Sequence, residues 1–157
     1  MAFKDYTFFS YVFLATAVIL FAGPAHADLC DNAPNKQVCK SVVSDRTDPR
    51  DAVVASMHKL VSQTKAGKVV ARKFDKSLGI VPCIKDFDGA IGDARGALKS
   101  LSNNDLSALK NFIASARNKF DTCNKGFQGY GETNPIPKTT KLLDDIASVG
   151  LYLANLI

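Results

Sequence analysis

The side chains best suited to catalysis are scarce in this chain. Beyond residue 27 there is one histidine, His58, and one glutamate, Glu132. General acid–base and nucleophilic catalysis both need such groups gathered at one place. The adjacent aspartates Asp144 and Asp145 would point about 100° apart on a helix, so they do not form a facing pair. We therefore expect a protein that is not an enzyme, with no catalytic residue, no metal site and no cofactor.

The other reactive side chains are four cysteines: Cys30, Cys39, Cys83 and Cys123. A zinc site is disfavoured because the spacing contains no Cys-x2-Cys half. An even number of cysteines predicts two disulfides if the chain is secreted. Four cysteines allow three pairings. We favour the pairing of neighbours, Cys30 with Cys39 and Cys83 with Cys123, because the first bond then closes a short, hairpin-sized loop.

Residues 1–27 have the pattern of a secretory signal peptide. One lysine precedes a nearly continuous apolar run at 6–22, and residues 25–27, Ala-His-Ala, fit a small-x-small cleavage site. The alternative, a membrane anchor, is disfavoured because the run is short and is broken by Gly-Pro at 23–24. Cleavage would leave residues 28–157 as one domain with a net charge of +5 and no membrane contact.

Four segments after the leader carry apolar residues at steps of three and four, which indicates amphipathic helices. The apolar stripes run over residues 53–78, 84–101, 106–123 and 139–157. Asp48 is the expected N-cap of the first helix, with Pro49 at its first position. Gly126 is expected to end the third helix.

Segments of this kind, joined by short connections and without strand-like alternation, predict an all-α fold. We expect an up-and-down four-helix bundle over residues 48–157. The segment at 28–47 is too short for a fifth long helix. We interpret it as a small helical hairpin that the bond between Cys30 and Cys39 clamps.

Several short motifs along the chain are together similar to those of one known family. They are Cys30-x8-Cys39, Ser44-Asp45, Asp48-Pro49-Arg50, Cys83 with Phe87 and Ala90-Ile91, Ala97-Leu98 to Asp105, the run from Thr122 to Phe127, and the run from Leu142 to Ile157. In this order they resemble the plant pectin methylesterase and invertase inhibitors. The resemblance covers essentially all of residues 28–157.

The resemblance implies a protein inhibitor that reversibly occludes the substrate cleft of its target enzyme, one to one, with the side of the bundle. The expected target is a pectin methylesterase. An acid invertase is the alternative within the same fold, and a non-inhibitory bundle that binds cell-wall polyanions is the alternative outside it. The implied location is extracellular, in the apoplast or cell wall, or else the vacuole.

Some positions depart from the family pattern. Phe87 replaces a usual tyrosine, Ala147 stands where many members have a further cysteine, and the segment at 51–82 is shorter than usual. Several invertase inhibitors carry Pro-Lys-Phe between the second and third bundle helices, whereas this chain has Asn-Asn-Asp-Leu at 103–106. This difference favours the pectin methylesterase as target.

Three glycines in the second bundle helix are unusual, because glycine costs about 1 kcal/mol relative to alanine inside a helix. On a helical wheel, Gly89, Gly92 and Gly96 lie opposite the apolar stripe. Either the helix is simply weak, or a smooth outer face lets a partner approach its backbone. On the second interpretation we predict a partner-binding surface formed by Lys85, Gly89, Gly92, Gly96, Asn104, Asp105 and Ser107.

A basic ridge is predicted on the first bundle helix. Lys65, Lys68, Arg72 and Lys76 follow one another at steps of three and four, opposite the apolar stripe. This ridge is either a solvated face or a weak, salt-sensitive contact with pectin or with an acidic rim of the target. Nucleic acid is disfavoured as a partner because the ridge has no interleaved aromatic side chains for base stacking.

Overall fold

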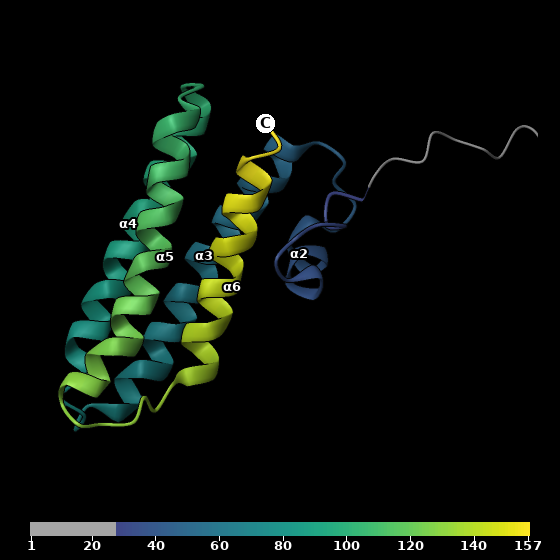
Figure 1. The fold of residues 1–157 in the computed structure, drawn as a ribbon. Helices are drawn as coiled ribbons and strands as arrows, with labels where there is room; N and C mark the ends of the chain where they lie inside the picture. The colour runs from purple at the N-terminus through teal and green to yellow at the C-terminus, as the bar shows by residue number, and fades with distance from the viewer. Residues whose placement is uncertain (1–27) are drawn as a thin grey trace, which may run out of the picture.

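The computed structural model describes residues 28–157, and the leader predicted at 1–27 lies outside them. The described part is helical and contains no strand. Its elements are α2 (Lys36–Val43), α3 (Pro49–Ala71), the short 3-10 helix η2 (Arg72–Phe74), α4 (Ile80–Ser102), α5 (Leu106–Gly129) and α6 (Pro137–Ala154). Helices α3 to α6 run up and down side by side (Figure 1), so the predicted four-helix bundle is confirmed.

Asparagine and aspartate side chains start three of these helices. Asp48 accepts hydrogen bonds from the amides of Arg50 (2.7 Å) and Asp51 (3.1 Å) at the start of α3, as predicted. Asp105 accepts from the amide of Ala108 (2.9 Å) at the start of α5. Each cap satisfies amides that the first helical turn leaves without partners.

Two predicted helix ends are wrong. Helix α3 stops at Ala71 and η2 turns the chain, so Phe74 and Leu78 are 38% and 65% exposed instead of continuing the buried stripe. Helix α5 continues past Gly126 to Gly129, because Phe127 extends its apolar stripe by one step and is fully buried. Buried contacts outweigh the weak helix propensity of one glycine.

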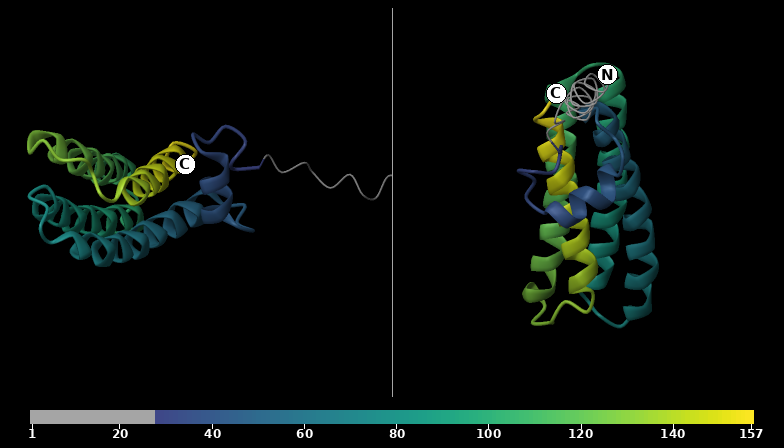
Figure 2. Two further views of the ribbon diagram at one scale, coloured as in Figure 1. Left: turned by 90° about the horizontal axis from the view of Figure 1, so that it is seen from below. Right: turned by 90° about the vertical axis from the view of Figure 1, so that its right-hand side faces the viewer.

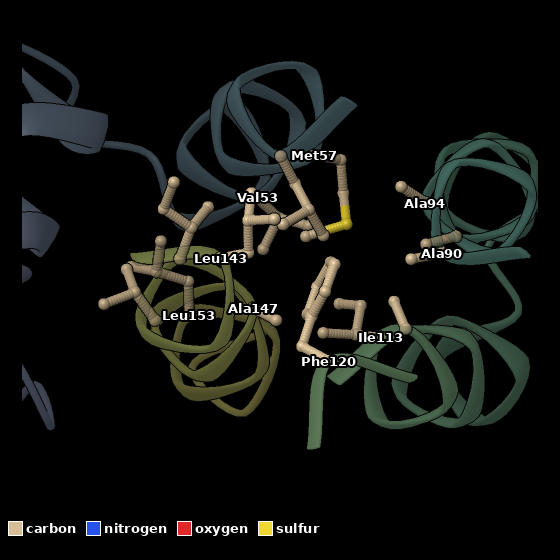
Figure 3. Packing of buried hydrophobic residues seen from close by; sticks show 14 of the residues in the cluster. Val53, Met57, Ala90, Ala94, Ile113, Phe120, Leu143, Ala147 and Leu153 are labelled. Carbon is tan, nitrogen blue, oxygen red and sulfur yellow. The ribbon is translucent and has the colours of Figure 1, made fainter. Parts of the chain in front are cut away.

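The core lies between the four long helices. Met57 of α3 and Phe120 of α5 point toward each other there (Figure 3), and both side chains are fully buried. Phe87 of α4 meets Phe120 edge to face, with ring centroids 5.9 Å apart. Ala90 and Ala94 of α4 also point into this interior (Figure 3) and are fully buried.

The structure contains the disulfides Cys30–Cys39 and Cys83–Cys123, the pairing of neighbours that we favoured. The second bond ties the start of α4 to the last third of α5, with Cα atoms 4.5 Å apart. In the clamped segment at 28–47 a turn leads into a single helix, α2, so only one arm of the expected helical hairpin is helical.

Helix α2 lies across one side of the bundle. It crosses α3 and α6 (Figure 2) and makes no contact with α4 or α5. Asn35 at its start donates to Asp145 of α6 (Nδ2 to Oδ2, 3.2 Å), and Val42 and Val43 at its end are buried. Within residues 28–157 no helix combines the length and apolar character required to cross a membrane. The fold therefore has one covered face, formed by α3 and α6, and one open face, formed by α4 and α5.

Candidate functional site

The predicted partner-binding stripe lies on α4, along the side that borders α5. Lys85, Gly89, Gly92 and Gly96 are separated by four, three and four residues, so they share one face of the helix. Lys85 and Gly92 are exposed, and a Cβ added at Gly92 would meet no atom within 4 Å. The wheel prediction of an open glycine face therefore holds at Gly92.

Gly89 and Gly96 differ from Gly92, because side chains of α5 lie over them. A Cβ at Gly96 would come within 2.8 Å of the Phe112 ring, and one at Gly89 would overlap the stem of Lys119. Both glycines are half-buried. The expectation that all three glycines lie free of the fold is therefore wrong for these two, which make room for α5.

A polar network fixes the side chain that crosses Gly89. Lys119 forms an ion pair with Asp93 (Nζ to Oδ2, 3.1 Å), and Ser115 donates a hydrogen bond to the same carboxylate oxygen (2.8 Å). One turn before Gly89, burial raises the pKa of the Asp86 carboxyl, and the nearby charges of Lys119 and Lys85 partly offset this rise. Charge on this face is therefore held in place by contacts between α4 and α5.

The remaining predicted residues lie at the far end of α4, in the connection to α5. Asn104 has a left-handed backbone (φ 59°), and its side-chain oxygen accepts from Arg50 (Nη1, 3.0 Å). Asp105 is committed to capping α5, whereas Ser107 is exposed. With a rise of 1.5 Å per residue, Lys85 lies about 28 Å from Asn104 along the helix. A partner that touches both must lie along the whole face.

Sequence reasoning missed three residues that shape this surface: Phe112, Lys119 and Arg50. Phe112 is 37% exposed and lies off the buried stripe of α5, which continues through Ile113. The available signal in the sequence was the position of Phe112, directly before the buried stripe residue Ile113. Nothing in the sequence pairs Arg50 with the α4–α5 connection or with the end of α4, where it also donates to the carbonyl of Leu101 (Nη2, 3.0 Å).

The basic ridge is not one helical face, because α3 ends at Ala71. Arg72 therefore lies in η2, and Lys76 lies in the connection beyond it. Lys68 is paired with Asp88 of α4, while Lys65 is exposed on α3. The four cations therefore do not present the continuous strip that the spacing predicted.

The described residues offer no assembled chemical centre. His58 is exposed on α3, and residues 28–157 contain no group of three or more His, Cys, Asp or Glu side chains arranged to hold a metal ion. What remains as a candidate site is the open surface of α4 and α5. Such a surface can bind a macromolecule through shape and charge.

Comparisons with known proteins agree with this architecture. The family model described as plant invertase/pectin methylesterase inhibitor matches residues 24–153. A sequence search of curated proteins gives no match. The crystal structure of mutant form A of a pectin methylesterase inhibitor from Arabidopsis is similar, with a TM-score of 0.72 and 13% identity over 84% of this chain and 96% of that one. A second pectin methylesterase inhibitor structure, from Arabidopsis thaliana, gives a TM-score of 0.49 and 17% identity over 94% and 86% of the two chains.

Proposed function

This chain belongs to the plant invertase/pectin methylesterase inhibitor family, and we propose that it inhibits a pectin methylesterase by reversibly occluding the substrate cleft in a one-to-one complex. The observation that carries the proposal is the open face of α4 and α5, because α2 covers only the opposite side of the bundle. Gly92 lies on this open face, with free space where a side chain would be. No covalent step is needed for such a blockade.

The open face is suited to docking because it is rigid and long. Helices α4 and α5 have 23 and 24 residues, which makes each about 35 Å long. A typical stable interface covers about 800 Å² on each partner, an area that such a pair of helices can supply. The disulfide Cys83–Cys123 and the ion pair between Lys119 and Asp93 hold the two helices together. Preorganisation of this kind reduces the entropy lost on binding.

The residue inventory supports inhibition over turnover. His58 lies in the middle of α3, and Glu132 lies in the α5–α6 connection, where its carboxylate accepts three hydrogen bonds. Neither residue is placed with a second catalytic group. We therefore propose that the purified protein hydrolyses neither pectin nor sucrose.

The α4–α5 connection bears on the choice of target. It reads Asn103, Asn104, Asp105 and Leu106, and its polar members shape the turn and cap α5. Several members that inhibit invertases have Pro-Lys-Phe at this connection. Its absence supports pectin methylesterase as the target over an acid invertase. A wall-binding bundle without inhibitory activity stays the competing proposal from a different class.

Parallel titrations test the proposal directly. Purified protein is added to a pectin methylesterase and to an acid invertase, and residual activity is followed to a stoichiometric end point. Saturable loss of methylesterase activity at one inhibitor per enzyme, reversed on dilution, is the expected result. Loss of invertase activity alone would reassign the target. Full activity of both enzymes would leave the wall-binding alternative.

Secretion is part of the same proposal, since a pectin methylesterase acts on the cell wall. The leader predicted at 1–27 would be removed, and the two disulfides would form in the secretory pathway. N-terminal sequencing of protein recovered from the extracellular fluid should start near residue 28. Recovery of the uncleaved chain inside the cell would contradict this part.

A further inference from the structure

A cleft of about 640 Å³ opens at the end of the bundle opposite the α4–α5 connection. The α3–α4 and α5–α6 connections meet at this end (Figure 1). Residues 73–77 form one side of the cleft, and Glu132, Thr133 and Pro135 form the other. The cleft has no part in the docking face described above, so both surfaces can be occupied at once.

Glu132 fixes the two sides of the cleft relative to each other. Its carboxylate accepts hydrogen bonds from the Ser77 hydroxyl and from the amides of Leu78 (2.9 Å) and Gly79 (3.1 Å). These bonds lower the pKa of the Glu132 carboxyl, with the bond from Ser77 contributing most. They also cap α4, whose N-cap residue Gly79 has no side chain to do so. Glu132 therefore serves the fold, and its oxygens are already engaged.

Cations gather at the rim of this cleft. Lys73 and Lys76 line it, and Arg72 precedes them in η2. All three side chains are exposed, and none forms an ion pair within residues 28–157. Two carboxylates, Asp75 and Glu132, also line the cleft, and the hydrogen bonds that lower the pKa of Glu132 keep it ionised. Three cations against two carboxylates leave the rim with a net charge of 3 − 2 = +1, which favours an anionic ligand.

Apolar surface accompanies these cations. Phe74 is 38% exposed and lines the cleft together with Pro135. Leu78 and Tyr130, at the same end of the bundle, are 65% and 53% exposed. An exposed apolar patch rimmed by charge marks an interaction site. Lysines beside a partly exposed aromatic ring and the Thr133 hydroxyl match a ligand with carboxylates, hydroxyls and C–H faces, which is the chemistry of a sugar acid.

We propose that the bundle-end cleft binds a segment of polyuronate, with Lys73 and Lys76 pairing with its carboxylates and Phe74 packing against a pyranose ring. The choice of a uronate rests on the proposed function, because a pectin methylesterase leaves free carboxylates on its polymer. Binding at this cleft keeps the inhibitor on the polymer where its target has acted. The open face of α4 and α5 stays free for the enzyme.

The test is a binding titration with a de-esterified galacturonate oligomer, followed by NMR shift changes and by calorimetry. The double variant Lys73→Gln/Lys76→Gln should bind the oligomer roughly tenfold more weakly, because two exposed ion pairs are lost. The matched control Lys36→Gln/Lys59→Gln removes the same charge from two exposed lysines of α2 and α3, unpaired within the described residues, and should bind like the parent. Phe74→Ala should weaken binding without reducing its salt dependence.

Oligomers of different charge distinguish a specific binding site from general electrostatic attraction. A fully methyl-esterified oligomer, which is uncharged, should bind far more weakly than the de-esterified one. The proposal would be overturned if both lysine double variants lost the same affinity for the oligomer. It would also be overturned by NMR shift changes spread over the whole surface, or by no binding at all. Inhibition of the pectin methylesterase is measured on the same variants with a small soluble substrate. Retained inhibition without uronate binding refutes the cleft alone, and uronate binding without inhibition refutes the proposed function alone.

Discussion

Gly92 distinguishes the open half of the bundle from the covered half. In the covered half, Gly67 of α3 and Gly150 of α6 are buried, and a Cβ at Gly150 would lie 2.6 Å from the Met57 methyl and 2.7 Å from the Ser56 hydroxyl. In the open half, Gly92 of α4 has no atom near its missing Cβ. Packing explains the first pair of glycines and leaves the third without a role in the fold.

The two halves are also held together differently. Helices α4 and α5 are neighbours in sequence, joined by a short connection and by the bond Cys83–Cys123. Helices α3 and α6 are distant in sequence and adhere through buried side chains, with α2 laid across them. The half that must present a surface is therefore cross-linked, and the half that is covered relies on its packing.

The largest effect should come from cutting the cross-link of the open half. Replacing both Cys83 and Cys123 by serine frees a loop of 40 residues in sequence, which the chain-entropy model values at about 4 kcal/mol of unfolding free energy. Because a small domain has about 5–15 kcal/mol in total, the variant should melt at a much lower temperature. Denaturant unfolding followed by circular dichroism measures the loss.

The matched control is the double variant Cys30→Ser/Cys39→Ser in the covered half. Its separation of 9 residues gives a smaller loss, about 2.5 kcal/mol, and inhibition should persist because α2 lies away from the open face. Equal losses in the two variants, or loss of inhibition in a folded Cys30→Ser/Cys39→Ser protein, would break the contrast between the halves. Non-reducing peptide mapping should first show the two bonds; a crossed pairing would contradict the topology.

Alanine at the two kinds of glycine should change stability in opposite directions. At Gly150 the added methyl overlaps Met57 and Ser56, and overpacking of this kind costs about 1–3 kcal/mol. Part of this cost is offset by the helix propensity of alanine, so we expect a net loss of up to about 2 kcal/mol. Thermal unfolding of Gly150→Ala checks the sign, and a more stable variant would show that Met57 yields without cost.

Gly92→Ala is the counterpart in the open half. Its methyl enters free space, so the propensity gain of about 1 kcal/mol should appear in full. The same melting experiment measures it, and Gly96→Ala, whose methyl would contact the Phe112 ring at 2.8 Å, serves as the comparison on the same helix. A destabilised Gly92→Ala would mean that this position is packed after all.

The smallest stability effect concerns Glu132, whose hydrogen bonds join the α5–α6 connection to the α3–α4 connection. Its folded pKa lies below the ordinary value of 4.5, so its contribution to stability is complete above pH 4.5 and is lost as pH falls through the lower folded pKa. Glu132→Gln should therefore be less stable than the parent at neutral pH, with the gap closing in acid. Unfolding curves across this range measure the gap. A gap that stays constant, or that appears equally in Asp75→Asn, would remove Glu132 from this role.

The sequence predicted the elements of this fold well because its strongest signals are local. Asp48 with Pro49 marks the start of α3, and the apolar steps from Leu109 to Cys123 mark the buried side of α5. The end of α3 was missed because apolar residues at spacings of three and four continue through Phe74 and Leu78, after the chain has turned. Periodicity does not register a turn that keeps the same spacing.

The candidate site was harder to predict, since its shape depends on which α5 side chains cross α4. A helical wheel treats Gly89, Gly92 and Gly96 alike, and the structure separates them through Lys119 and Phe112. The role of Glu132 was also hidden, because its hydrogen-bond partners lie more than 50 positions earlier in the chain. Contacts between distant segments leave no periodic signal in a single sequence.

The most direct test of the account is inhibition by Gly92→Glu beside the control Ser62→Glu, an equal charge placed on an exposed residue of α3. Both proteins are titrated against the pectin methylesterase after circular dichroism has shown intact helices. The account predicts that Gly92→Glu inhibits at least about tenfold more weakly, because a charged side chain blocks close approach to α4, while Ser62→Glu inhibits like the parent. Equal inhibition by all three proteins would contradict docking on the open face.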